Sequence, residues 1–219
     1  MSKAAMSKAS HAVLLLAAGQ SLRLGQPKQL LHKNGITLIR HMAQLALATQ
    51  PTRMIAVLAP EHFLQQPAQK LAQQPSNQTI AAQLENLPVQ IVINEAASTG
   101  MASSLQVGAS ALQYQQQAIL IMGVDQPLLS AKHLTQLLMQ YQTSAVLAVV
   151  SAYADTIGLP AVVSASLLQQ SRHLTGDYGL KRLFMQHPES LSQVNAEVLA
   201  FDIDTPDALQ HARQQGWID

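Results

Sequence analysis

Short runs of apolar residues recur through residues 11–150 of this chain, and segments with helical spacing lie between most of them. Short, fully apolar runs are typical of strands that are buried on both faces of a sheet. Strands that alternate with helices form parallel sheets with a helical layer on each face. We therefore expect an α/β fold, a three-layer α/β/α Rossmann-like domain with a mostly parallel sheet. The predicted strands are residues 11–16, 54–58, 89–93, 118–122 and 145–150, and the predicted helices are residues 36–47, 61–74, 101–112 and 131–141.

Residues 151–219 follow a less regular pattern. We expect residues 152–160 to form an extended connection. Thr205 or Asp204 is expected to cap a final helix, which has Pro206 in its first turn. The other predicted elements are strands at residues 161–163 and 198–203 and helices at residues 166–172, 180–186 and 206–215.

The composition is that of a folded globule. Hydrophobic residues make up 48% of the chain and charged residues 11%, a balance that favours a packed core over disorder. No repeat and no long linker divides the sequence, so we predict a flexible N-terminal tail over residues 1–11 and a single domain over residues 12–219. A net charge of +1 argues against the broad basic face that nucleic-acid binding requires.

Three further absences in the sequence narrow the function. The chain has no cysteine, which excludes disulfides, a thiolate nucleophile and a cysteine-based metal site. Its eight histidines include no pair at the spacing of a helical zinc site. No apolar run approaches the roughly 20 residues of a transmembrane helix. We therefore expect a cytoplasmic protein with neither a membrane nor a nucleic-acid partner.

The apolar run that ends at Leu16 leads directly into a loop of small and basic residues. Small residues allow backbone N–H groups to approach an anion closely, and the basic residues neutralise its charge. The loop has neither the Gly-Lys-Ser/Thr of a P-loop nor the Gly-x-Gly-x-x-Gly of a dinucleotide site. It is therefore predicted to bind phosphate in some other way. The small and basic residues of this loop are Ala17, Ala18, Gly19, Arg23 and Lys28.

Carboxylates follow two of the predicted strands. Asp125 comes after the strand at residues 118–122, and Asp202 and Asp204 lie at the end of the strand at residues 198–203. The carboxyl ends of parallel strands meet at one edge of a sheet, so these acids are expected near the cations of the first loop. Mg²⁺ is bound in proteins by one or two carboxylates together with substrate phosphates. This set fits a phosphate ester held with a divalent metal. The alternative roles are helix capping for Asp125 and Asp204 and a strand end for Asp202.

The complete opening motif identifies a resemblance. Residues 16–28, LAAGQSLRLGQPK, match Leu-Ala-Ala-Gly-x-Ser-x-Arg-x-Gly-x-x-Lys, and the chain resembles the nucleotidyltransferases related to molybdenum cofactor guanylyl- and cytidylyltransferases. Further segments, which follow the family's order and extend the likeness over nearly the whole chain, resemble its cytidylyltransferase branch and the purine-hydroxylase accessory relatives. These segments are PKQLL at residues 27–31, GMASSL at 100–105, DQP at 125–127, GDYG at 176–179 and DIDTP at 202–206.

The resemblance implies a nucleotide site and a metal site. Arg23 and Lys28 would bind the triphosphate and stabilise charge in the transition state, which makes them catalytic together with Asp125. Asp125 would bind Mg²⁺ with the help of Asp204, and Asp202 is the alternative second ligand. The residues that would hold the base, ribose and phosphates are Leu16, Ala17, Ala18, Gly19, Ser21, Arg23, Lys28, Asn94, Gly100, Met101 and Ser104.

The acceptor site is implied by the same resemblance. Gly158, Pro160, Gly176 and Asp177 would line it. Relatives often have histidine or arginine between the glycine and the proline, where this chain has Leu159, so recognition of the acceptor differs or another residue supplies the contact.

The implied reaction is Mg²⁺-dependent transfer of CMP from CTP to a molybdopterin-type molybdenum cofactor, with release of pyrophosphate. Guanylyl and cytidylyl transferases share the opening motif, which leaves the base open. A sugar or alditol phosphate is the alternative acceptor. The alternative outside catalysis is an accessory protein that delivers the cofactor to a molybdenum hydroxylase apo-enzyme.

Overall fold

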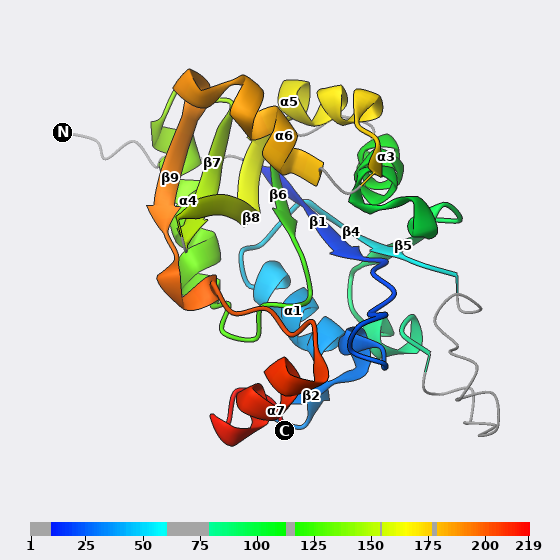
Figure 1. Ribbon diagram of the computed structural model, residues 1–219. Coiled ribbons are helices and arrows are strands. Elements are labelled where there is room, and N and C mark those ends of the chain that lie inside the picture. Colours follow the sequence, from blue (N-terminus) through cyan, green and yellow to red (C-terminus); the bar gives the residue numbers. More distant parts are fainter. Residues whose placement is uncertain (1–9, 61–78, 113–116, 154, 177–178) are drawn as a thin grey trace.

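A seven-stranded sheet forms the centre of the protein, in a computed structural model that describes residues 10–60, 79–112, 117–153, 155–176 and 179–219 (Figure 1). The strand order is β5-β4-β1-β6-β8-β7-β9. Only β8 runs antiparallel to its neighbours, and every other pair is parallel, which confirms the mostly parallel sheet. The strands are β1 (His11–Ala17), β4 (Arg53–Leu58), β5 (Gln90–Ile93), β6 (Ala118–Met122), β7 (Ala148–Tyr153), β8 (Thr156–Ser164) and β9 (Leu191–Asn195).

Helices cover both faces of this sheet. Side chains of a strand alternate between its faces: Val13 and Leu15 of β1 belong to one buried cluster, and Leu14 and Leu16 belong to another. Helices α1 (Leu38–Leu47), α4 (Ala131–Thr143) and α7 (Pro206–Gln214) contribute to the first cluster. Helices α3 (Met101–Leu112), α5 (Ala165–Gln169) and α6 (Gly179–Gln186) contribute to the second. The three-layer α/β/α architecture is confirmed.

Short elements complete the fold. The strands β2 (His32–Lys33) and β3 (Ile36–Thr37) form a small antiparallel pair just before α1. Of the two predicted caps for the last helix, Thr205 is observed, since its hydroxyl accepts a hydrogen bond from the Ala208 N–H. The 3-10 turns are η1 (Lys28–Leu30), η4 (Ala82–Leu84), η5 (Ala97–Thr99), η6 (Gln170–His173), η8 (Pro188–Ser190) and η9 (Glu197–Leu199).

The middle of the sheet contains a topological switch point. The chain moves from β1 to β4 on one side and later places β6 on the other side of β1. The connections that leave the carboxyl ends of β1 and β6 therefore diverge, and a crevice forms between them. This is the edge of the sheet at which the loop after β1 and Asp125 were expected to meet.

Two sequence predictions about residues 151–219 were wrong, and the strand predicted just before them was placed a few residues too early. Residues 198–203 form no strand: Val198 is 66% exposed, and η9 occupies the start of this segment. The strand is instead β9, whose alternating polar residues concealed it. Residues 152–160 are no simple connection, because β7 and β8 pair through them as a hairpin. The strand predicted at residues 145–150 begins later, at Ala148.

Two other predictions fall mainly outside the described residues. The helix predicted at residues 61–74 lies outside them, as does most of the tail predicted at residues 1–11, although His11 belongs to β1. Within the described residues, no helix is both long enough and apolar enough to cross a membrane.

Candidate active site

The loop after β1 folds back on itself and returns Lys28 to the end of the strand. Ser21 has a left-handed backbone, with φ of 53°, and its carbonyl accepts hydrogen bonds from the N–H groups of Leu24 and Gly25, each at 3.1 Å. The Ser21 hydroxyl accepts a third bond, from the Lys28 N–H at 3.2 Å. Ser21 and Lys28, both predicted site residues, are thus hydrogen-bonded to each other. Gly19, in the same loop, is exposed.

Gln29 supports this loop from behind and was not predicted as a functional residue. Its side chain is fully buried, and Nε2 donates to the carbonyl oxygens of Ala17 and Gly19 at 2.8 and 2.9 Å. These bonds fix the backbone whose N–H groups were predicted to meet phosphate. A polar residue next to the apolar Leu30 and Leu31 was the only signal in the sequence that a buried amide is needed here.

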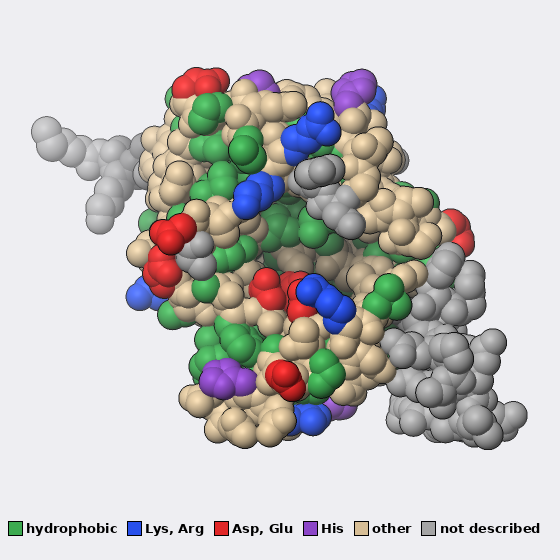
Figure 2. Space-filling model, in the orientation of Figure 1, with side chains coloured by type: hydrophobic (Ala, Val, Ile, Leu, Met, Phe, Trp, Pro, Cys, Tyr) green, Lys and Arg blue, Asp and Glu red, His purple; other side chains and the backbone are tan. Residues whose placement is uncertain are grey.

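Lys28 lies between two carboxylates that come from distant parts of the chain. Its Nζ is 3.2 Å from Oδ2 of Asp125 and 2.6 Å from Oδ1 of Asp204. Arg23 Nη2 contacts the other oxygen of Asp204 at 2.8 Å. The structure therefore brings together all four charged residues that were predicted to act on the triphosphate and the metal. Figure 2 shows acidic and basic side chains side by side at a hollow in the centre of this face.

The two acids keep Lys28 charged. Burial lowers the pKa of the Lys28 ammonium, but the charge of Asp125 and the hydrogen bond that Lys28 donates to Asp204 outweigh burial, and the pKa is raised. For Asp204, partial burial acts to raise the pKa, while the hydrogen bond and charge of Lys28 and the charge of Arg23 lower it further than burial raises it. An ammonium and a carboxylate therefore face each other at neutral pH.

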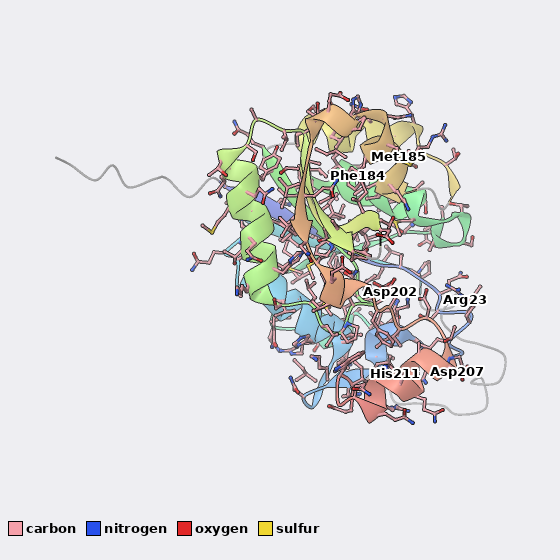
Figure 3. All side chains as sticks on the ribbon, turned by 60° about the vertical axis from the view of Figure 1, so that its left-hand side comes forward. Arg23, Phe184, Met185, Asp202, Asp207 and His211 are labelled. Atoms are coloured by element: carbon pink, nitrogen blue, oxygen red, sulfur yellow. The ribbon has the colours of Figure 1, made fainter. Side chains whose placement is uncertain are left out.

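Asp202 lies beside this cluster and has different surroundings. In Figure 3 it stands between the ends of the strands and helix α7. Its side chain reaches the surface, yet loss of hydration in the cleft, together with the charges of Asp125 and Asp204, raises its pKa to about 7. Of the two candidates for a second metal ligand, Asp204 is the one that shares a cation with Asp125.

Asp125 and Asp204 fit a divalent metal only if bound substrate and water supply the remaining ligands of that metal. Within the described ranges, no group of three or more histidine, aspartate or glutamate side chains is arranged to hold a metal ion. Asp125 and Asp204 already lie close enough to bind one cation, the Lys28 ammonium, together. Mg²⁺ retains several waters and is completed by substrate phosphates, so two carboxylates are a sufficient protein contribution.

The residues predicted to lie against base and ribose meet at the start of α3. Asn94 is fully buried, and its amide donates to the hydroxyls of Ser103 and Ser104 at 2.8 and 3.0 Å. These bonds tie the end of β5 to α3, so Asn94 shapes the segment rather than lying at its surface. Gly100 has a φ of 107°, a conformation that favours glycine, and Met101 after it is 43% exposed.

Local packing or backbone conformation accounts for the residue types found at several predicted acceptor positions. A Cβ at Gly158 would lie 2.5 Å from the hydroxyl of Tyr153, so packing favours glycine there. The Leu159 side chain packs against the second apolar cluster. Gly176 is exposed with φ of 67°, and Asp177 lies outside the described residues.

One contact links the predicted nucleotide and acceptor segments. A Cβ at Gly179, the first residue of α6, would lie 2.8 Å from Sδ of Met101. The starts of α3 and α6 therefore meet, with Met101 against Gly179.

Comparison with known families identifies the class of this protein. Residues 13–191 match the family model described as the MobA-like NTP transferase domain, and the chain belongs to this family. The match spans β1 to the start of β9 and includes the loop after β1 and Asp125.

Individual relatives share the fold over almost the whole chain. Nicotine blue oxidoreductase of Paenarthrobacter nicotinovorans is 28% identical over 201 residues, which cover 88% of this chain and 91% of the relative. The crystal structure of Rv0371c from Mycobacterium tuberculosis has a TM-score of 0.72 and 23% identity, with 95% of this chain and 100% of that chain covered. A second Rv0371c structure, a complex with manganese, has a TM-score of 0.64 and 23% identity over 92% of this chain and 97% of that chain. A nucleotidyl transferase from Methanothermobacter has a TM-score of 0.72 and 22% identity, covering 94% and 97%.

Proposed function

We propose that this protein is a Mg²⁺-dependent nucleotidyltransferase that moves CMP from CTP to a molybdopterin-type molybdenum cofactor and releases pyrophosphate. The observation that carries the proposal is the position of Lys28 between Asp125 and Asp204, at the crevice between β1 and β6. In such a cluster, the ammonium can exchange its carboxylate partners for a triphosphate, and the carboxylates can exchange the ammonium for a metal.

The charges of the cluster define what each residue would do. An oxygen of the acceptor phosphate attacks the α-phosphorus of CTP, the new P–O bond forms, and the bond to the departing pyrophosphate breaks. Lys28 and Arg23 would leave their carboxylate partners for phosphate oxygens and stabilise the negative charge on the departing group. Asp125 and Asp204, freed from these cations, would hold Mg²⁺, which neutralises phosphate charge when bound. The loop backbone at residues 17–21, fixed by Gln29, would orient the nucleotide.

The metal is inferred from two independent sources. Two carboxylates beside a phosphate-binding loop are the donor set that Mg²⁺ takes in phosphate enzymes. A structural relative, Rv0371c, has been solved as a complex with manganese, and manganese prefers the same oxygen ligands.

The choice of CTP and of a molybdopterin-type acceptor rests on the resemblance of residues 27–31, 100–105 and 176–179 to the cytidylyltransferase branch. Leu159 stands where relatives often have histidine or arginine, and it packs against the second apolar cluster, so an alditol or sugar phosphate is the alternative acceptor. A molybdenum hydroxylase apo-enzyme is the proposed recipient of the finished cofactor.

The name of one relative raises a second class of function, because it is an oxidoreductase. Two features of this chain favour transfer over oxidation and reduction. The sequence lacks the Gly-x-Gly-x-x-Gly of a dinucleotide site, and the cleft contains paired acids with Lys28. A cofactor-delivering accessory protein would bind without releasing pyrophosphate, which separates it from a transferase, and without oxidising NADH or NADPH, which separates it from an oxidoreductase.

A pyrophosphate-release screen tests the proposal. The wild-type protein is mixed with each of the four nucleoside triphosphates and Mg²⁺, with molybdopterin or an alditol phosphate as acceptor. We expect release with CTP and molybdopterin. Release only with the alditol phosphate would show that this compound, and not molybdopterin, is the acceptor. Oxidation of NADH or NADPH without pyrophosphate release would show that the protein is an oxidoreductase.

A further inference from the structure

Gln126, the residue after Asp125, joins its own loop to β8 and to η9 through one buried amide. It is 5% exposed, and its Nε2 lies 3.1 Å from the carbonyl oxygen of Leu159 and 3.2 Å from that of Leu199. Leu159 belongs to the proposed acceptor segment on β8, and Leu199 ends η9, which leads to Asp202 and Asp204. The amide has two protons, so it can serve both carbonyls at once.

Two further side chains hold the same stretch of β8. The Tyr153 hydroxyl donates to the carbonyl of Leu159 at 3.1 Å, and the Ser151 hydroxyl donates to the carbonyl of Pro160 at 2.7 Å. Two consecutive carbonyls are therefore fixed by three side-chain donors. Two of these donors, Ser151 and Tyr153, lie on β7 and hold the stretch within the β7–β8 hairpin, and Gln126 is the donor that ties it to the loop after β6.

The backbone of Asp125 has an anchor that does not depend on Gln126. Its carbonyl accepts a hydrogen bond from the Ile203 N–H at 3.1 Å. Loss of the Gln126 amide would therefore leave Asp125 attached to the segment that contains Asp204, while it would release one of the bonds that locate β8. The site has a nucleotide half, which contains Asp125 and Asp204, and an acceptor half, which contains residues 158–160. Gln126 connects the two.

We propose that Gln126 is a positioning residue that sets the spacing between Asp125, on the nucleotide half, and residues 158–160, on the acceptor half. This inference rests on the proposed function. Transfer requires the attacking oxygen and the α-phosphorus to meet in a defined geometry, and a displacement of about 1 Å lowers rates by on the order of 100-fold.

The test compares three variants in the transfer reaction with CTP, Mg²⁺ and molybdopterin. Gln126→Met keeps the length of the side chain and removes its donors. Tyr153→Phe removes one hydroxyl from Leu159 and keeps the ring, which provides a milder variant if Gln126→Met fails to fold. Gln140→Met is the matched control, because Gln140 bonds to Ser192 and Gln193 on β9 and joins no part of the site.

We expect Gln126→Met to raise the KM for molybdopterin by ~10-fold or more and to lower kcat. The dissociation constant of Mg·CTP, measured by calorimetry, should stay within about twofold of wild type, because the nucleotide half keeps its own anchors. Tyr153→Phe should shift the acceptor KM in the same direction by a smaller factor, and Gln140→Met should change neither constant.

Two results overturn the inference. In the first, Gln126→Met, or Tyr153→Phe if Gln126→Met does not fold, transfers CMP with wild-type constants. In the second, acceptor and nucleotide binding weaken equally, which indicates a general structural role. Failure of the proposed function is distinguishable, since the wild-type protein itself would then release no pyrophosphate. In that case amide hydrogen exchange decides: faster exchange at residues 157–163 of Gln126→Met than of Gln140→Met supports the positioning role, and equal exchange removes it.

Discussion

The ammonium of Lys28 lies 2.6 Å from the carboxylate of Asp204, although 176 positions separate the two residues in the chain. The contact joins the first loop of the fold to the segment that precedes its last helix. Asp125, from the loop after β6, shares the same ammonium at 3.2 Å. The candidate site therefore depends on three loops that only the folded sheet brings together.

Replacement of Lys28 by alanine should lower turnover by on the order of 100-fold or more, as expected for loss of a preorganised charge at the departing pyrophosphate. Pyrophosphate release under saturating CTP and acceptor measures the effect. Lys132→Ala is the matched control, because Lys132 is exposed on α4, and it should keep full activity. Wild-type turnover by Lys28→Ala would remove this residue from the triphosphate site.

Replacement of Asp125 by alanine should abolish Mg²⁺-dependent activity, since one of the two carboxylates that would hold the metal is lost. Calorimetry with Mn²⁺ and CTP should show weaker binding of the metal–nucleotide pair. Asp207→Asn, which removes an exposed charge on α7, serves as the control and should behave like wild type. Full activity of Asp125→Ala with unchanged metal dependence contradicts the assignment.

The pH dependence of stability should report Asp202. Its pKa is raised from 3.8 to about 7, so the folded protein binds this proton more tightly than the unfolded chain does. Stability then falls as pH rises between these two values and is constant above the higher one. Asp202→Asn cannot ionise and should avoid this loss.

The measurement is thermal unfolding of wild type and Asp202→Asn, with a chelator present, at a series of pH values. The advantage of the variant should grow from about pH 4 to about pH 7 and then level off. An advantage that is independent of pH, or one that shrinks as pH rises, would show that Asp202 has no raised pKa.

Gly158→Ala should destabilise the protein by about 1–3 kcal/mol, the usual range for overpacking, because its Cβ would lie 2.5 Å from the Tyr153 hydroxyl and 3.3 Å from the ring carbon that carries it. Urea unfolding of both single variants and the double variant with Tyr153→Phe tests this cause. The double variant should be more stable than the sum of the two single effects implies, and the rescue should be partial because the ring carbon stays close. Strict additivity would point to another reason for glycine at this position.

The sheet could be predicted from the sequence where its strands are apolar on both faces. The run at Leu14 and Leu15 and the run at residues 118–122 form the buried centre, and their pattern leaves no other interpretation. Edge strand β9 was missed because three of its five residues are polar, and its two apolar residues, Leu191 and Val194, pack against different clusters. The strand predicted at residues 198–203 failed for the opposite reason, since its apolar residues are spaced around a 3-10 turn.

The candidate site was predictable as far as its charged residues, because Arg23, Lys28, Asp125 and Asp204 all follow predicted or actual strand ends. Which acid pairs with which cation was not predictable, since this depends on the path of the chain between β9 and α7. The roles of Gln126 and Gln29 could not be predicted, because an amide that donates to backbone carbonyls is recognised only when the structure shows where those carbonyls lie.

The central claim is that Lys28, Asp125 and Asp204 form a metal–triphosphate site for nucleotidyl transfer. Its most direct test is the stoichiometry of pyrophosphate release from CTP and molybdopterin with Mg²⁺ or with a chelator. We predict one pyrophosphate for each cytidylylated acceptor formed with Mg²⁺, and none with the chelator. Release that is unaffected by the chelator, or no release with any of the four triphosphates from folded protein, would contradict the account.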